Sequence, residues 1–398
     1  MHTVGIVCEY NPFHKGHLYQ LNETKQLLKE DATVVCAMSG DFVQRGEAAV
    51  FDKFVRAEAA CRCGADLVVE LPLPWCISTA ESFAFGAVSI LSALGCDILS
   101  FGSESADAGA LSRLAAFSAD ESAQKRIRTL LDADATLSFA RARQIAAAES
   151  LGETAALLSE PNDILAVEYL KAVHRIGSAM KPLAVRRVGA GHDSAAAGEY
   201  CSAKALRTMM VNGEDPGPFI PEPAMQVFRR EMEAEKTPDR RLLEVALLSR
   251  LYQLKAEDFD SLPDAGGGAG RRLYEALWSS DKLETTVRSA SSKRYTAARM
   301  RRMLYCAALG ICAEDTKMLP PYIRILASNE KGRAHLSHFR GKTALPVVNK
   351  YNEVKKLGIQ AEKVFKLCAA AHELYRLACP ISKRCMPGED WRHCPVIV

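Results

Sequence analysis

The sequence has no long hydrophobic run. None of its apolar stretches approaches the roughly 18 residues that a membrane-spanning helix needs. The first residues, Met1–Val7, have neither the basic n-region nor the cleavage site of a secretory signal peptide. We therefore expect a cytoplasmic protein that has no membrane as a partner.

Paired Cys-x-x-Cys motifs, which mark structural zinc sites, are missing as well. The 13 cysteines are scattered through a chain without an export signal, so reduced thiols are the expected state. We interpret the cysteines as packing residues and the histidines near them as surface residues, and we predict no metal ligand. This interpretation covers Cys61, Cys63, His335, His338, Cys379, Cys385, His393 and Cys394.

The composition also lacks the biases of fibrous or disordered chains. With 48% hydrophobic and 25% charged residues, it excludes collagen, coiled coil and intrinsic disorder. No internal repeat is present. A chain of 398 residues is long enough for two or three hydrophobic cores.

Basic residues are in deficit in the first part of the chain and in excess in the last third. Residues 1–280 carry 29 Lys and Arg against 38 Asp and Glu, a net charge of −9, whereas residues 281–398 carry 22 against 10, a net charge of +12. Clustered cations attract phosphate backbones, although a merely solvated surface has the same composition. Nucleic acid is therefore a candidate partner of the last third.

Short β-branched runs alternate with amphipathic stretches in the first hundred residues, which is typical of βαβ units around a parallel sheet. We predict an α/β fold whose crossovers form a doubly wound, Rossmann-like layer. The predicted strands are 3–8, 33–38, 66–71, 97–101 and 182–188, and the predicted helices are about 16–29, 52–63 and 78–94, several within 105–177, and one from about Ser202.

Four prolines between residues 216 and 223 mark the clearest domain boundary. We predict an α/β domain over residues 1–215 and a mainly helical, basic domain over residues 216–398. One flexible interruption is expected in the second domain, at residues 264–270.

The segment with most chemical information follows the first predicted strand and contains His14-Lys15-Gly16-His17. His14 and His17 are three residues apart, so both face the same side of a helix start. Unpaired N–H groups and the helix dipole favour phosphate oxygens there, and imidazoles can add charge-assisted hydrogen bonds. Gly16 leaves room for a nucleotide. A lone histidine is more often a capping or surface residue, but the position after the first strand favours nucleotide binding.

This motif resembles the H-x-G-H of the nucleotidyltransferase superfamily, which grips the triphosphate of ATP while the α-phosphorus is attacked. The resemblance implies a HUP-type fold for the first domain and a later Ser-containing motif that ends in Arg. Residues 201–207 stand at the expected place, with Lys204 where the superfamily favours a hydroxyl residue. Ser202 can alternatively be an ordinary helix N-cap, and Arg207 a surface residue.

Other segments resemble the tRNA(Met) cytidine acetate ligase family, and the resemblance covers most of the chain. At position 41 this sequence has Asp where the family pattern has Asn, and residues 379–398 match nothing in that pattern. The segments are 38–48, Lys53 and Arg56, 64–72, 80–84, 101–104, 161–169, 186–187 and, more loosely, 292–296 and 329–333.

This resemblance implies a ligase that activates acetate with ATP and releases pyrophosphate. The acetyl-adenylate would then acetylate the exocyclic N4 amine of the wobble cytidine in elongator tRNA(Met), giving N4-acetylcytidine. AMP is a good leaving group, which a weakly nucleophilic cytosine amine needs. Mg²⁺ is expected on the phosphates, although no carboxylate cluster identifies a dedicated protein site. The sequence leaves the oligomeric state open.

Two other functions remain open. One is a small-molecule adenylyltransferase of the same superfamily, which the size of the basic domain disfavours. The other is a non-catalytic RNA-binding protein that keeps a nucleotide pocket. The lack of a K-M-S-K-S-like loop argues against a class I aminoacyl-tRNA synthetase.

The resemblance also assigns roles to individual positions. The catalytic residues would be His14, His17, Ser202 and Arg207, and Ser39, Gly40, Gln44 and Arg45 would lie on the acetate or tRNA side of the pocket. The residues that would bind ATP are Val7, Cys8, Glu9, Tyr10, Asn11, Pro12, Phe13, His14, Lys15, Gly16, His17, Leu18, Tyr19, Gln20, Gly102, Asn162 and Arg187.

The last three of these have simpler alternatives. Gly102 can be a tight-turn glycine, Asn162 a helix N-cap and Arg187 a strand-end surface charge. Because all three residues are expected near the carboxyl ends of strands, we expect them to share one crevice.

A basic segment in the last third is the candidate tRNA-binding surface. Its cations can follow phosphates and its tyrosines can stack an unpaired base, as anticodon loops are usually recognised. A solvated helix face would have the same pattern, but the surrounding net charge favours RNA. We predict one helix that carries Lys293, Arg294, Tyr295, Arg299, Arg301, Arg302 and Tyr305, with Lys293, Arg294, Tyr295, Arg299 and Arg302 in contact with tRNA.

Overall fold

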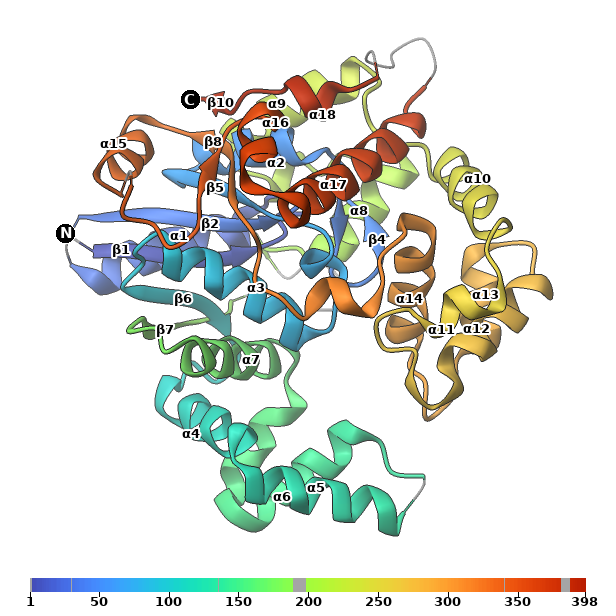
Figure 1. Cartoon of the computed structure of the whole chain (residues 1–398). Helices are drawn as coiled ribbons and strands as arrows, with labels where there is room; N and C mark the ends of the chain where they lie inside the picture. Colours follow the sequence, from blue (N-terminus) through green and yellow to red (C-terminus); the bar gives the residue numbers. More distant parts are fainter. Residues whose placement is uncertain (1, 30, 135, 189–197, 340, 381–386) are drawn as a thin grey trace.

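An eight-stranded mixed sheet forms the central layer of the protein (Figure 1). The computed structural model describes residues 2–29, 31–134, 136–188, 198–339, 341–380 and 387–398. The strand order is β10-β8-β5-β2-β1-β6-β7, with β9 paired to β8. The strands are β1 (His2–Cys8), β2 (Ala32–Ser39), β5 (Leu67–Leu71), β6 (Ile98–Ser103), β7 (Lys181–Arg186), β8 (Ile323–Ser328), β9 (Val347–Val348) and β10 (Val396–Ile397).

The five strands from β5 to β7 are parallel, as predicted, and confirm the α/β class. Every residue of β2 is buried, because helices cover both faces of the sheet. The strand order reverses between β1 and β6. In open α/β sheets the crevice that receives ligands opens at this switch point.

Helices cover the two faces of the sheet in separate hydrophobic clusters. One cluster joins α1 (Lys15–Leu28), α2 (Lys53–Arg62) and α9 (Glu222–Glu233) to the sheet, and the other joins α3 (Ala80–Ala93) and α7 (Pro161–Ile176). Gly5 allows the close approach of β1 and α3, since a Cβ there would lie 2.9 Å from Leu91 Cδ1.

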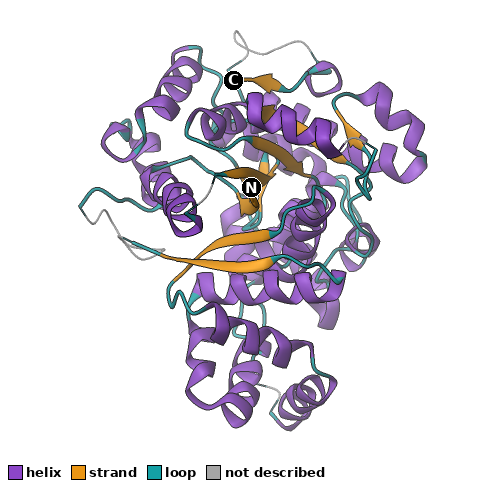
Figure 2. Cartoon of the chain, turned by 90° about the vertical axis from the view of Figure 1, so that its left-hand side faces the viewer, coloured by secondary structure: helices purple, strands orange, loops and turns teal. Residues whose placement is uncertain are grey.

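The remaining helices include a small lobe beside the sheet and the helices of the second half of the chain. In Figures 1 and 2, α4 (Ala108–Ala119), α5 (Glu121–Ala133) and α6 (Phe139–Leu151) make a small lobe below α7. After α8 (Ala203–Asn212) come α10 (Arg240–Leu251), α11 (Ala256–Asp260), α12 (Ala269–Trp278), α13 (Leu283–Ala290), α14 (Ala297–Leu309), α15 (Glu330–Phe339), α16 (Tyr351–Val354), α17 (Ile359–Leu377) and α18 (Glu389–Arg392). No helix among the described residues is long and apolar enough to cross a membrane.

The central sheet continues beyond the boundary predicted at residue 216. β8 pairs antiparallel with β5, and β9 and β10 pair with β8. The sequence analysis predicted no strand in this part of the chain. Arg324 interrupts the apolar run of β8, yet its side chain is only 1% exposed. The strand is stable there because Arg324 is paired within the core.

A buried ionic cluster joins the two halves of the chain. Lys53 Nζ lies 2.8 Å from both Glu70 Oε1 and Asp390 Oδ1, and Arg324 Nη1 lies 2.8 Å from Asp390 Oδ2. All four side chains are at most 2% exposed. A buried charge that loses its partner is costly, so this cluster fixes the C-terminal elements against α2 and β5.

Asp41 extends this cluster. Its Oδ1 accepts the backbone N–H of Lys53 at 2.9 Å, and its Oδ2 lies 2.9 Å from Nδ1 of His372 in α17. Burial alone would raise the pKa of Asp41, but the charge and hydrogen bond of His372 outweigh it and lower the pKa to about 2. Burial alone would lower the pKa of His372, but the charge and hydrogen bond of Asp41 outweigh it and raise this pKa well above its usual value. The Asp at position 41 is therefore half of a buried ion pair.

The cysteines and histidines agree only in part with the sequence analysis. Most of the described cysteines are buried free thiols, but Cys394 is exposed, and Cys385 lies outside the described residues. His335 is buried rather than on the surface, and its Nε2 lies 2.9 Å from the Leu94 carbonyl oxygen. Within the described ranges, no group of three or more His, Cys, Asp or Glu could hold a metal ion.

Candidate active site

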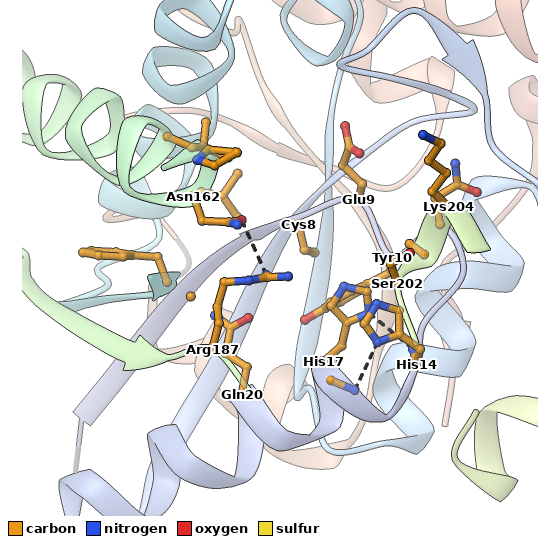
Figure 3. Close-up of a pocket in the computed structure, with 18 of the residues that line it drawn as sticks. Cys8, Glu9, Tyr10, His14, His17, Gln20, Asn162, Arg187, Ser202 and Lys204 are labelled. Carbon is orange, nitrogen blue, oxygen red and sulfur yellow. Dashed lines mark hydrogen bonds between the residues drawn. The ribbon is translucent and has the colours of Figure 1, made fainter. Parts of the chain in front are cut away.

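A cavity of about 370 Å³ opens at the carboxyl ends of β1, β6 and β7, at the switch point of the sheet (Figure 3). Most of the residues predicted to bind ATP line it. They are Val7, Cys8, Glu9, Tyr10, Asn11, His14, Gly16, His17, Tyr19, Gln20, Gly102, Asn162 and Arg187.

Four of the predicted ATP-binding residues do not line this cavity: Pro12, Phe13, Lys15 and Leu18. Phe13 is fully buried, and its ring centroid lies 5.6 Å from that of His17. Tyr10, 2% exposed, contacts the same imidazole edge-on at 4.8 Å. The two aromatic rings therefore support His17 from behind, a role that the motif alone did not indicate.

The two histidines of the motif begin helix α1. His14 is the N-cap and its Nδ1 accepts the N–H of Gly16 at 3.1 Å, while His17 Nδ1 accepts the N–H of His14 at 3.2 Å. The imidazole rings stack with centroids 3.7 Å apart. A Cβ on Gly16 would lie 2.9 Å from the His14 ring, so this glycine makes room for the imidazole. His14 therefore caps α1 and also lines the cavity.

The imidazoles are neutral in this structure. Burial, followed by the charges of Arg187 and Arg207, lowers the pKa of His14 to about 3, and burial together with His14 lowers the pKa of His17 well below its usual value. Because each Nδ1 accepts a backbone N–H, the ring proton resides on Nε2. The two imidazoles are therefore neutral Nε2–H donors, which can still make charge-assisted hydrogen bonds to anionic phosphate oxygens.

The segment at residues 201–207 reaches the same cavity. Ser202 caps α8 by accepting the N–H of Ala205 at 3.2 Å and also lines the cavity. Arg207 is not a free surface residue. Its guanidinium donates to the carbonyl oxygen of Asn11 at 2.9 Å and pairs with Glu47 at 2.7 Å. This contact ties α8 to the turn after β1.

Asn162 and Arg187 lie next to each other, on the opposite side of the cavity from the histidines (Figure 3). Arg187 Nη1 donates to Asn162 Oδ1 at 3.5 Å, and Asn162 in turn donates to Glu104. Asn162 is not the N-cap of α7, because that position is Glu160. A Cβ on Gly102 would make only an ordinary van der Waals contact with Arg187, 3.4 Å from its Cγ.

Comparisons with known proteins agree with this geometry. A family model described as HIGH Nucleotidyl Transferase matches residues 1–388. A tRNA(Met) cytidine acetate ligase of Syntrophotalea carbinolica is 37% identical over 94% of this chain and 92% of its own length. One of a Thermoanaerobacter species is 35% identical over 99% of both chains. The chain belongs to the tRNA(Met) cytidine acetate ligase family.

Two solved structures of a member of this family, TmcAL of Thermotoga maritima, have the same fold over the whole of both chains. The apo form is 32% identical with a TM-score of 0.94, and a form bound with alpha-thio ATP is 31% identical with a TM-score of 0.92.

In this member of the ligase family, a short hairpin of β3 (Phe42–Val43) and β4 (Glu47–Ala48) forms one wall of the cavity. Gln44 donates its backbone N–H to Glu9 Oε1 at 2.7 Å and its side-chain amide to the Ser78 carbonyl at 3.0 Å. Arg45 is exposed at the cavity and has no ion pair with a described residue. Gln44 and Arg45 thus line the cavity, and their place on the acetate or tRNA side stays a prediction.

Ser39 and Gly40 do not line the cavity, contrary to prediction. Both of their carbonyl oxygens accept hydrogen bonds from the guanidinium of Arg56, which is fully buried. The same guanidinium donates to the Glu9 carbonyl oxygen at 2.5 Å. Arg56 therefore joins the carboxyl ends of β1 and β2 behind the cavity wall.

The predicted tRNA-binding helix of this ligase-family chain begins later than expected. Helix α14 starts at Ala297, so Lys293, Arg294 and Tyr295 precede it. Tyr295 is only 9% exposed, with its hydroxyl donating to the Gly267 carbonyl. The stacking face predicted for Tyr295 is therefore covered.

Most of the neighbouring cations are engaged within the protein. Arg299 donates to the carbonyl of Asp264 at 2.6 Å, Arg302 pairs with the Asp264 carboxylate at 3.3 Å, and Arg301 pairs with Glu284 at 3.0 Å. The contacts of Arg299 and Arg302 hold the loop at residues 264–270, which was predicted to be a flexible interruption.

Helix α14 contacts the hairpin that lines the cavity. Gly46 has a φ of +75°, and a Cβ there would lie 2.8 Å from the backbone nitrogen of Arg302. Lys293 and Arg294, both exposed, precede the same helix. The basic segment is thus connected through α14 and the hairpin to the cavity wall.

Proposed function

We propose that the protein ligates acetate to the wobble cytidine of elongator tRNA(Met) at the expense of ATP. The observation that carries this proposal is the pair of Nε2–H donors of His14 and His17 at the start of α1, beside a cavity at the switch point. The ligase activity for which the relatives are named supports the reaction, and the alpha-thio ATP bound to a structural neighbour supports the nucleotide.

The histidine end of the cavity suits a triphosphate. The Nε2–H groups, the N-terminus of α1 and the guanidinium of Arg207 supply donors and positive charge for phosphate oxygens. Mg²⁺ enters with the nucleotide, as the MgATP substrate, since the described residues offer no cage of three ligands. Asn162, Arg187 and Gly102 border the part of the cavity left for the nucleoside.

Two displacements then complete the reaction. A carboxylate oxygen of acetate attacks the α-phosphorus, and pyrophosphate leaves as acetyl-adenylate forms. The N4 amine of cytidine attacks the acetyl carbonyl carbon, the bond to the phosphate oxygen breaks, and AMP leaves. Arg45 is a cation at the cavity suited to a carboxylate or an RNA phosphate.

For the RNA, we propose that residues 1–215 supply the ATP site and residues 216–398 the main tRNA-binding surface. The net charge of +12 in residues 281–398 and the contact between α14 and the hairpin support this division of labour. A tRNA substrate also implies that the protein acts in the cytoplasm.

Removing the two exposed cations before α14 should weaken tRNA binding. In Lys293→Ala with Arg294→Ala, each lost phosphate contact is expected to lower the slope of log K against log salt by about 0.9. Filter binding of tRNA(Met) between low and moderate salt measures this slope. The matched control removes two exposed cations from α5, Lys125→Ala with Arg128→Ala. An unchanged slope in the first variant would exclude this segment from the RNA interface.

The proposed activity is tested with labelled acetate, ATP and tRNA(Met). We expect label on the tRNA, in a nucleoside that co-migrates with N4-acetylcytidine, and none when the cytidine at the wobble position is replaced by uridine. Acetate-independent transfer of AMP to a phosphorylated small molecule would instead support an adenylyltransferase. Binding of tRNA with neither reaction would support a non-catalytic RNA-binding protein.

A further inference from the structure

Glu9 occupies a special position in the cavity. It directly follows β1, and one carboxylate oxygen, Oε1, accepts the N–H of Gln44 at 2.7 Å. No other described residue donates a hydrogen bond to this carboxylate. Figure 3 shows the carboxylate turned away from His14 and His17. Glu9 therefore offers a fixed acceptor at the cavity, apart from the histidine pair.

Only two carboxylates line this cavity among the described residues, Glu9 and Glu47. Glu47 is occupied, because it pairs with Arg207 at 2.7 Å. Glu104, near the opposite wall, is occupied as well by Asn162. Among the described residues, Glu9 is therefore the cavity carboxylate that has no ion pair, and its Oε2 accepts no hydrogen bond from them.

The second step of the proposed reaction needs such a group. A cytosine amine is a hydrogen-bond donor, and Glu is a suitable partner because it accepts from the N4 amine of cytosine. A single-stranded base that enters a protein pocket presents this edge. The amine also loses a proton when it becomes an amide, and a positioned carboxylate can take it.

We propose that Glu9 binds the N4 amine of the target cytidine and acts as the general base of acetyl transfer, an inference that rests on the proposed function. The nitrogen forms a bond to the acetyl carbonyl carbon as the bond from that carbon to the AMP oxygen breaks. The amine proton goes to Glu9 Oε2 and then to water. AMP carries away the electron pair of the broken bond.

The surroundings of Glu9 suit a base. The pKa of Glu9 is raised from its usual value, mainly by burial. The Gln44 N–H and the charges of Arg207 and Arg45 oppose this shift, and the charge of Glu47 adds to it. A carboxylate with a raised pKa is a stronger base than an exposed one and accepts a proton more readily near neutral pH. The same carboxylate anchors the hairpin through Gln44, so a test must separate chemistry from positioning.

Glu9→Gln separates these roles, because the amide oxygen can still accept the Gln44 N–H whereas the amide nitrogen can neither accept from the cytosine amine nor take its proton. We expect acetyl transfer to tRNA to fall by more than about 100-fold. Acetate-dependent ATP–pyrophosphate exchange should fall by less than about tenfold. Hydroxylamine, which needs no positioned base, should still capture the acetyl group as acetohydroxamate. Glu121→Gln, an exposed residue of α5, is the matched control.

Glu9→Asp adds a rescue test, since a shorter carboxylate should restore part of the transfer rate and the acidic limb of its pH profile, both lost in Glu9→Gln. Equal losses of exchange and transfer in Glu9→Gln, or an unchanged pH profile, would show that Glu9 only positions the hairpin and would overturn the inference. Failure of the wild-type protein to acetylate tRNA would instead contradict the proposed function itself.

Discussion

Replacing His17 with glutamine is expected to lower acetate-dependent ATP–pyrophosphate exchange by about 10²–10³-fold, the loss typical of one preorganised donor to a developing charge. Glutamine at this third helical position can still accept the N–H of His14, as in a capping box, so α1 should form normally. The variant lacks the Nε2–H that we place on the phosphates. The loss should therefore appear in the chemical step and not in the fold.

Exchange rates, thermal unfolding and tRNA binding of this variant measure the effect together. We expect an unfolding temperature close to that of the wild type and tRNA affinity within a few-fold. His174→Gln, an exposed histidine in α7, is the matched control and should behave as the wild type in all three assays. Normal exchange by His17→Gln would remove the histidine pair from catalysis.

The largest effect on stability is expected at the ion pair that joins the two halves of the chain. His372→Gln leaves the Asp41 carboxylate buried without its cation, which typically costs about 3–5 kcal/mol of unfolding free energy. Urea unfolding of the variant beside His174→Gln, whose change should stay within about 0.5 kcal/mol, measures this loss. Asp41→Asn combined with His372→Gln should lose less than the sum of the single variants.

The contribution of this pair depends on pH in a defined direction. The pKa of His372 is raised in the folded protein, so its contribution is fully present below the unfolded pKa, about 6.5, and is lost as pH rises through the folded pKa. The pKa of Asp41 is lowered to about 2, so its contribution is present above about 3.9 and is lost on acidification. The stability difference between wild type and His372→Gln should be largest near pH 5 and shrink above pH 6.5. A difference that grows with pH would contradict a charged His372.

The five parallel strands and the place of the cavity could be predicted from the sequence, because both follow from local signals. β-Branched runs, the glycine in the H-x-G-H motif and parallel connectivity together place His14, His17 and Gly102 at one edge. The place of Arg207 at the same cavity followed from the resemblance to the nucleotidyltransferase superfamily and not from any spacing.

Pairings between distant segments could not be predicted in this way. An arginine such as Arg324 is not expected in a buried strand, because the sequence does not show that Asp390, 66 residues later, pairs with it. Ser39 and Gly40 resemble pocket residues until the guanidinium of Arg56 is seen on their carbonyls. Tyr295 is covered by a loop that the sequence marks only by its glycines.

The central claim is that acetate attacks the α-phosphorus of ATP in this cavity before its acetyl group reaches RNA. Acetate labelled with ¹⁸O in both oxygens tests it directly, in the presence of ATP and tRNA(Met). We expect one ¹⁸O in the phosphate of AMP and the other in the acetyl carbonyl on the cytidine, with none in pyrophosphate. AMP without ¹⁸O, in a reaction that still acetylates the tRNA, would contradict the acetyl-adenylate route.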